Sequence, residues 1–157
     1  MEISKSSRHS KITGDFGEHL VLYWLSKHGF ECANVDHTGI DIIAKNPVTK
    51  ELMGISVKSR SRNKGTEDTG VNIPRDNIEK SKIACEAFGC VPYFAVVVDG
   101  ASKIMVFILS LKELQKIHPP AKRISSWTMG KKKIDEYYAN PDIKIFEFDY
   151  KTSRWWE

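Results

Sequence analysis

The sequence has no long apolar run, since nowhere in its 157 residues do 18 or more apolar residues follow one another. We therefore expect no membrane-spanning helix and no membrane partner. The first residues, MEISKSSRHSK, also lack the apolar segment of a secretory signal. Cysteine is scarce, with Cys32, Cys85 and Cys90 in no CxxC or CxxH pair. This pattern argues against a disulfide framework and a zinc site, and it favours a reducing, cytoplasmic location.

The charge that is present is mildly positive and clustered. The formal net charge is +4, which permits a nucleic-acid partner without requiring one. A solvated surface would explain any one of the basic clusters taken alone. The clusters are Lys5, Arg8 and Lys11; Lys58, Arg60, Arg62 and Lys64; and Lys131, Lys132 and Lys133.

The order of helices and strands follows from hydrophobic periodicity and from turn residues. Thr13 is expected to cap a helix over about residues 14–28, and a second helix is expected between Pro74 and Gly89. Strands are expected at 30–35, 40–45, 51–58, 92–99, 103–109 and 143–150, with a short helix at 111–117. Residues 59–73 are expected to form a long loop, and 121–142 an irregular basic segment. This order of elements predicts a flexible basic arm at 1–12 and a single domain at 13–157.

Three polar residues stand out on the second and third expected strands. Asp41 lies among isoleucines, although aspartate is depleted from strand interiors. Ser56 and Lys58 share one face of their strand because side chains repeat every two residues. The hairpin register decides whether Asp41 joins them, and a slip of one residue would move it to the other face. An ordinary Asp–Lys pair on a solvent-facing sheet surface is the alternative.

The motifs resemble those of the PD-(D/E)XK nuclease superfamily, and within it the archaeal-type Holliday-junction resolvases. The similar segments are GDFGEHLVLYWLSKHGF with Glu18, TGIDIIA with Asp41, and ISVKSRS with Lys58. The resemblance covers a core over residues 13–98 and leaves a C-terminal extension at 99–157. It implies an α/β, restriction-endonuclease-like core of order α-β-β-β-α-β. A mixed central sheet would be flanked by helices, with C-terminal strands and a short helix added.

The resemblance also implies a catalytic site for Mg²⁺-dependent hydrolysis of DNA phosphodiester bonds, with Mn²⁺ as a possible substitute. Asp41, Glu18 and the backbone carbonyl of Val57 would bind the metal, and Lys58 would orient or help deprotonate the attacking water. Ser56 departs from the family pattern, which has Glu, Asp or Gln two residues before the lysine. Glu18, or Glu67 and Asp68 in the expected loop, could supply the missing carboxylate.

Phosphate contacts are expected from Arg60, Arg62 and Lys64, directly after the lysine strand. Lys80 and Lys82 on the second helix could add to them, although the exposed polar face of an amphipathic helix is the favoured explanation for both. Two other functions remain open from the sequence. One is a catalytically degenerate nucleic-acid-binding module of the same fold. The other is a homodimeric protein-interaction domain that uses the terminal strand and the RWWE ending.

Overall fold

The computed structural model describes residues 4–119 and 124–156, and these form four helices and eight strands. The helices are His9–Lys27 (α1), Arg75–Phe88 (α2), Leu111–Ile117 (α3) and Lys131–Ala139 (α4). The first four strands are Glu31–His37 (β1), Ile40–Lys45 (β2), Leu52–Ser61 (β3) and Val71–Pro74 (β4). The others are Val91–Asp99 (β5), Lys103–Ser110 (β6), Ile124–Trp127 (β7) and Lys144–Asp149 (β8). None of the described helices is both long and apolar enough to cross a bilayer.

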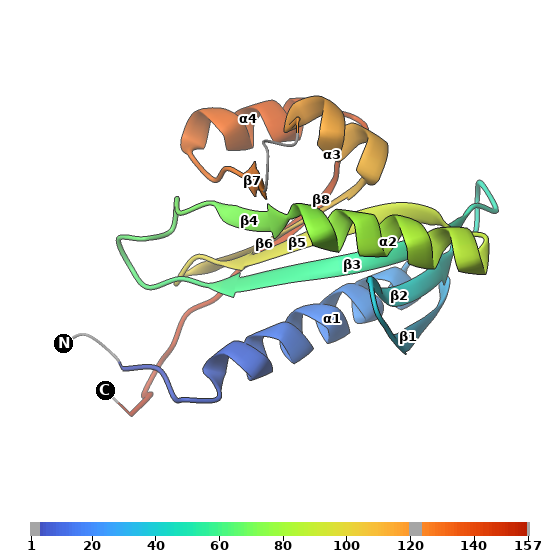
Figure 1. Ribbon diagram of the computed structural model, residues 1–157. Helices are drawn as coiled ribbons and strands as arrows, with labels where there is room; N and C mark the ends of the chain where they lie inside the picture. Colours follow the sequence, from blue (N-terminus) through green and yellow to red (C-terminus); the bar gives the residue numbers. More distant parts are fainter. Residues whose placement is uncertain (1–3, 120–123, 157) are drawn as a thin grey trace.

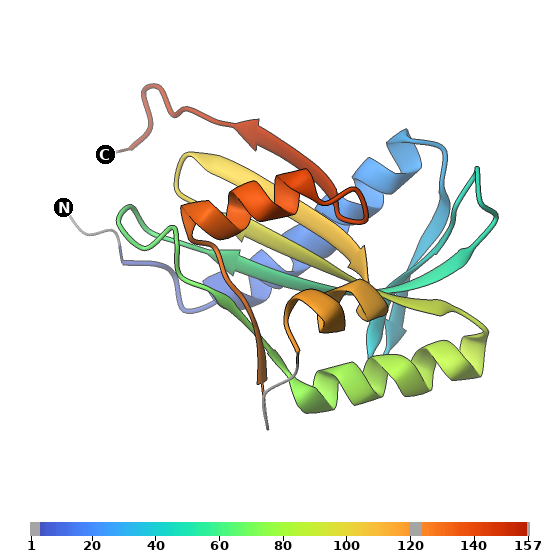
Figure 2. The same cartoon turned by 90° about the horizontal axis from the view of Figure 1, so that it is seen from above.

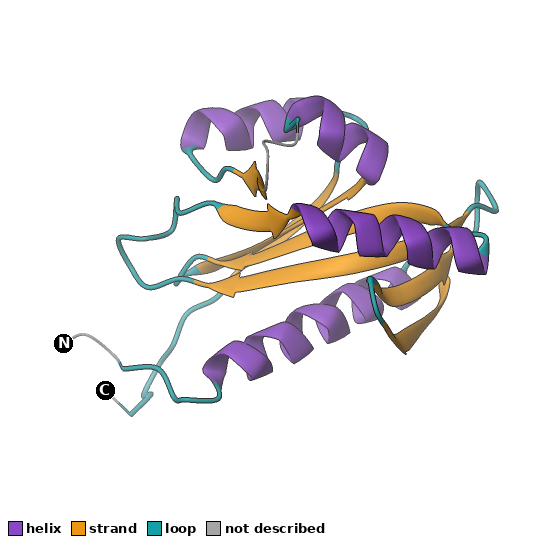
Figure 3. Ribbon diagram, in the orientation of Figure 1, coloured by secondary structure: helices purple, strands orange, loops and turns teal. Residues whose placement is uncertain are grey.

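The elements stack in three layers, with α1 on one face of a central sheet and α2, α3 and α4 on the other (Figure 1). Figure 3 shows the helices on both faces by secondary structure. Seen from above, α2 and α4 lie across the same face of the sheet, with α3 beside them (Figure 2). Burial on both faces of β3 and β5 follows from this layering.

The central sheet has the order β1-β2-β3-β5-β6-β8 and is mixed. β3 and β5 run parallel, whereas the other neighbouring strands run antiparallel. The hairpin of β2 and β3 pairs Ile42 with Ile55 and Lys45 with Leu52. β4 and β7 form a separate two-stranded sheet. The hairpin therefore places the two strands that carry Asp41 and Lys58 side by side, as the sequence predicted.

Two apolar clusters hold the layers together. Val21 and Leu25 of α1 pack with Ile42, Ile55 and Val97 on one face of the sheet. On the opposite face, residues of β5 and β6 pack against α2, α3, β4, β7 and α4, with Phe94, Val96, Phe107, Trp127 and Tyr137 among the buried members. β5 is covered on both faces, which explains its near-continuous apolar sequence and confirms that it is a central strand.

The first helix begins earlier than the sequence predicted. α1 starts at His9, so residues 9–12, expected in the flexible arm, are helical. Thr13 does not cap the helix, because its hydroxyl donates a hydrogen bond to the carbonyl of His9, one turn earlier. Arg8 occupies the cap position without a side-chain hydrogen bond. The first turn begins with three polar residues, His9, Ser10 and Lys11, so apolar periodicity does not reveal this helix start.

Two segments expected to be irregular contain regular structure. β4 lies inside the expected loop at 59–73, with Val71 and Ile73 buried and Asn72 exposed. β7 and α4 lie inside the expected irregular segment, whose residues 121–123 fall outside the described part of the chain. Trp127 and Tyr137 stack there with ring centroids 4.1 Å apart. Each element is short and buries very few side chains, so tertiary packing rather than local periodicity stabilises it.

Candidate functional site

The candidate site forms where β2 stops pairing with β3. Their ladder ends at Ile42 and Ile55, but β3 continues to Ser61. The carboxylate of Asp41 accepts a hydrogen bond of 2.7 Å from the backbone N–H of Val57 at this free edge. The N–H and C=O of one residue in an extended strand point to the same edge. The carbonyl of Val57 therefore lies on the same edge as Asp41.

Lys58 extends from β3 toward the start of α2. Val96, its partner on β5, belongs to the core on the α2 face of the sheet. The ammonium of Lys58 donates a hydrogen bond of 2.7 Å to Oδ1 of Asn77, in the first turn of α2. Nδ2 of Asn77 in turn donates to Asp76 at 3.3 Å. Asn77 was not among the residues predicted from sequence, because only the docking of α2 on β3 brings it to Lys58.

Glu18 lies on the part of α1 that packs closely against β3. Gly17 is buried there, and a Cβ atom added to it would lie 1.7 Å from Oγ of Ser59. Only glycine allows this approach. Burial raises the pKa of Glu18, and the nearby charges of Asp41 and Asp15 raise it further. The Asp41 charge therefore acts on Glu18, although the two residues come from different layers of the fold.

Burial also perturbs the other two charged groups of the site. It raises the pKa of Asp41, while the Val57 hydrogen bond and the Lys58 charge act in the opposite direction. It lowers the pKa of Lys58, and the Asp41 charge opposes this shift. Partly desolvated charges of this kind are costly for folding and are common at functional sites.

The raised pKa of Asp41 predicts that Asp41→Asn stabilises the metal-free protein at neutral pH. A carboxyl whose folded-state pKa lies above its unfolded value binds its proton more tightly when folded. That stabilisation is complete below the ordinary pKa of 3.8 and is lost as the pH rises through the folded-state pKa. Asparagine cannot ionise and avoids the loss.

The measurement is urea unfolding of both proteins in a metal chelator, from about pH 4 to about pH 8. The variant's gain in free energy of unfolding should be largest at the alkaline end and shrink toward low pH. Asp36→Asn, at an exposed position of β1, is the matched control and should show no such trend. A variant less stable than the wild type at neutral pH would contradict the expectation.

The oxygen donors at this edge suit a hard divalent cation. They are the carboxylates of Asp41 and Glu18 and the carbonyl of Val57, and Mg²⁺ prefers such ligands while keeping several waters. Burial is the main cause of the raised pKa of Glu18, and a cation would offset the Asp41 charge that raises it further. Within residues 4–119 and 124–156, no group of three or more His, Cys, Asp or Glu side chains is placed to hold a metal ion. The donor set is thus small but chemically suitable.

No further carboxylate at this edge comes from position 56, which is a serine, or from Glu67 and Asp68 in the loop that follows β3. Ser56 is buried, with 4% of its surface exposed. Glu67 accepts a hydrogen bond from the N–H of Gly65, and with Asp68 it lines a cavity that Lys103 and Lys131 share. Of the carboxylates that the sequence offered in compensation, Glu18 is the one that the fold brings to Asp41.

The basic residues after Lys58 have different surroundings. Arg60 donates a hydrogen bond of 2.7 Å to the carbonyl of Ser59, and its charge lies close enough to lower the pKa of Lys58. Arg62 donates to the carbonyl of Gly70 at 2.8 Å and so holds the two ends of the loop together. Lys64 is exposed near the tip of that loop. The arrangement favours Arg60 and Lys64 over Arg62 as available cations.

The two lysines of α2 lie on different flanks of the helix. Lys80 follows Asn77 by three residues, about 60° around the helix axis, whereas Lys82 follows it by five, about 140° away. Lys80 forms an ion pair with Asp76 at 3.2 Å, and Lys82 with Glu79 at 3.3 Å. Lys80 is therefore near the Asn77 side of α2, and Lys82 is not.

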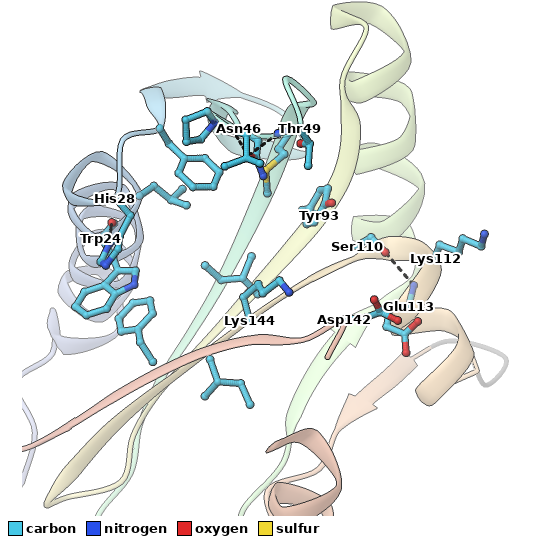
Figure 4. Close-up of a pocket in the computed structure, with 18 of the residues that line it drawn as sticks. Trp24, His28, Asn46, Thr49, Tyr93, Ser110, Lys112, Glu113, Asp142 and Lys144 are labelled. Atoms are coloured by element: carbon cyan, nitrogen blue, oxygen red, sulfur yellow. Dashed lines mark hydrogen bonds between the residues drawn. The ribbon is translucent and has the colours of Figure 1, made fainter. Parts of the chain in front are cut away.

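A separate cavity lies at the other end of the β2–β3 hairpin (Figure 4). Its volume is about 990 Å³, and its walls include Trp24, His28, Tyr93 and the turn at Asn46–Thr49. Lys112, Glu113 and Lys144 also line it. None of its lining residues is among those expected to act on a substrate, so it is distinct from the Asp41–Lys58 edge.

The architecture and topology are those of a restriction-endonuclease-like fold, as the sequence predicted. A solved Holliday junction resolvase (Hjc) from the archaeon Archaeoglobus fulgidus is similar in structure, with a TM-score of 0.57 and 18% sequence identity. The similarity covers 78% of this chain and 88% of that one. The bacterial homing endonuclease I-Ssp6803I is more distant, with a TM-score of 0.49 and 11% identity over 78% of each chain. No protein-family model and no curated protein sequence matches the chain.

Proposed function

We propose that this protein is a metal-dependent nuclease that hydrolyses DNA phosphodiester bonds. Asp41, Glu18 and the carbonyl of Val57 hold Mg²⁺ or Mn²⁺, and Lys58 serves the reacting phosphate. The single observation that carries the proposal is the convergence of Asp41 and Lys58 at the free edge of β3, in partly desolvated surroundings. A likeness in fold supports it as analogy only.

The metal, when bound, polarises the phosphate and activates water. The residues of the chain orient the metal ligand and supply hydrogen-bond donors. The N–H of Val57 fixes the Asp41 carboxylate in one orientation. Asn77 accepts one hydrogen bond from the Lys58 ammonium. The other two N–H groups of the ammonium can then bind the attacking water and stabilise the charge that develops on the phosphate.

Arg60, Lys64 and Lys80 are proposed to contact phosphates on either side of the site, with Arg62 and Lys82 in lesser roles. Such contacts read no sequence and weaken with salt. Four-way junctions are the first branched DNA to test, because the Archaeoglobus protein of the same fold is a Holliday junction resolvase.

A homodimer stays a prediction. β8 is an edge strand of the large sheet, and Trp156, which follows β8 in the sequence, is 89% exposed.

The test of the proposed function is calorimetric titration with Mg²⁺ and Mn²⁺, on the wild type and on Asp41→Asn, followed by cleavage of linear and branched DNA. We expect the wild type to bind and cleave and the variant to do neither. The titration is repeated with an uncleavable oligonucleotide, because a phosphate oxygen can complete the metal's shell. Cleavage by Asp41→Asn at the wild-type rate would refute the assignment.

A binding module without catalysis is the second candidate, and Ser56 is the observation that favours it. Serine is neutral, and loss of one carboxylate could lower metal affinity by about 10–100-fold, taking losses at supporting ligands as a guide. A module of this kind would bind DNA equally well with and without Mg²⁺. The same calorimetric and cleavage measurements separate the two candidates.

Asn77 is expected to be a positioning residue for Lys58. A hydrogen bond to a charged group is worth about 1.5–3 kcal/mol, so Asn77→Ala should slow cleavage about 10–100-fold with metal affinity unchanged. Asn77→Asp keeps the acceptor and should retain most activity. Asn72→Ala, at an exposed site on β4, is the matched control. Equal cleavage rates in Asn77→Ala and Asn72→Ala would exclude the role.

A further inference from the structure

A second polar pocket lies beside the continuation of the same strand edge. It has a volume of about 440 Å³ and is lined by residues 5–7, 9–10 and 13 of the N-terminal segment and residues 59–61 of β3. None of these lining residues is acidic, and each carries a hydroxyl, imidazole, ammonium or guanidinium group. Figure 1 shows the N-terminal segment near the end of β3. The lining is rich in hydrogen-bond donors.

The two cations of this pocket form hydrogen bonds to backbone carbonyls. Lys5 donates a hydrogen bond of 2.7 Å to the carbonyl of Ser61, and Arg60 one of 2.7 Å to the carbonyl of Ser59. No carboxylate of residues 4–119 and 124–156 forms an ion pair with either. Both carbonyls lie on the free edge that also presents Val57 to Asp41, since alternate residues of a strand share an edge.

Among residues 4–119 and 124–156, two polar atoms of the pocket's lining are buried and have no hydrogen-bond partner there. They are Nε2 of His9 and Oγ of Ser59. A buried polar atom without a partner destabilises the fold and calls for an explanation. A ligand rich in acceptor oxygens, admitted by a small shift of the neighbouring side chains, would provide one. The start of α1 reinforces this chemistry, because its first turn contains no acidic residue.

We propose that this pocket binds a backbone phosphate that flanks the cleaved phosphate of the nucleic acid, with Lys5, His9, Ser10 and Arg60 as its ligands. This inference rests on the proposed nuclease function and extends its substrate contacts to the N-terminal segment. From Val57 to Ser61 the edge of β3 spans about 13 Å at the usual rise per residue. The strand edge thus carries a catalytic end and a binding end.

The test measures binding of an uncleavable DNA duplex in Mg²⁺ over a range of salt concentrations. Ser10→Asp places a carboxylate in the pocket but favours the positive end of α1, so it should preserve or raise the melting temperature. A phosphate ligand predicts at least about tenfold weaker DNA binding, the usual scale for a like-charge contact close to a site. Lys5→Gln with His9→Gln should weaken binding too and lower the salt slope by about one.

Lys45→Gln, an equal change of charge at the exposed far end of β2, should leave affinity and salt slope unchanged. If Ser10→Asp and Lys5→Gln/His9→Gln bind DNA as the wild type does, the pocket is not a phosphate subsite. The nuclease proposal would then still stand wherever Asp41→Asn abolishes cleavage. If the wild type neither binds nor cleaves DNA, both proposals fall together.

Discussion

Lys58→Met should reduce the rate of DNA cleavage about 100–1,000-fold, which is the usual loss when one preorganised donor that stabilises charge is removed. The affinity for Mg²⁺ should stay intact or rise slightly. Methionine keeps the length and apolar stem of lysine but has no charge and no donor. The metal affinity is spared because Asp41, Glu18 and the carbonyl of Val57 remain. Loss of a nearby positive charge even favours a cation at that edge.

The measurement pairs single-turnover cleavage with calorimetric metal binding, on Lys58→Met and on Asp41→Asn. The lysine variant should lose cleavage alone, and the aspartate variant should lose both. Lys45→Met removes a lysine at the exposed end of β2 and should behave as the wild type. Wild-type cleavage by Lys58→Met would mean that this lysine serves folding rather than chemistry.

Gly39→Ala should lower the free energy of unfolding by about 2–4 kcal/mol, from overpacking together with left-handed backbone strain. Gly39 joins β1 to β2 with a φ of +98°, and a Cβ there would lie 2.3 Å from the backbone oxygen of Lys80. The obstructing atoms belong to the backbone of α2 and cannot rotate away. Because α2 also carries Asn77, displacing it should weaken the support of Lys58 and slow cleavage.

Gly65→Ala is the matched control, because it separates strain from contact. Gly65 has a φ of +93°, nearly that of Gly39, but no atom of the described residues lies within 4 Å of an added Cβ. Alanine there should cost about 1–2 kcal/mol, the usual penalty of the left-handed region. Urea denaturation of both variants gives the difference. Equal losses would show that the contact with α2 contributes nothing.

The predicted core order was largely correct because its elements have strong local signals. The apolar run of β5 and the alternation in β2 and β3 report burial directly. Gly89 ends α2 in a left-handed conformation, as the sequence indicated. β4, β7 and α4 were missed because each buries too few side chains to show a period. His9–Ile12 were assigned to the arm because the first turn of α1 is polar.

The sequence by itself determined which residues are candidates for the proposed chemistry: Glu18 on the first helix, Asp41 and Lys58 on neighbouring strands, and Ser56 where the family it resembles has Glu, Asp or Gln. It could not determine the register of the hairpin, since one residue of slip reverses every side chain. Only the tertiary structure decided that Asp41 meets the N–H of Val57 and that Asn77 meets Lys58. It likewise decided that the N-terminal segment lies along β3. These contacts join residues 16, 19 and 56 positions apart, and separations of that size are set by packing rather than by local periodicity.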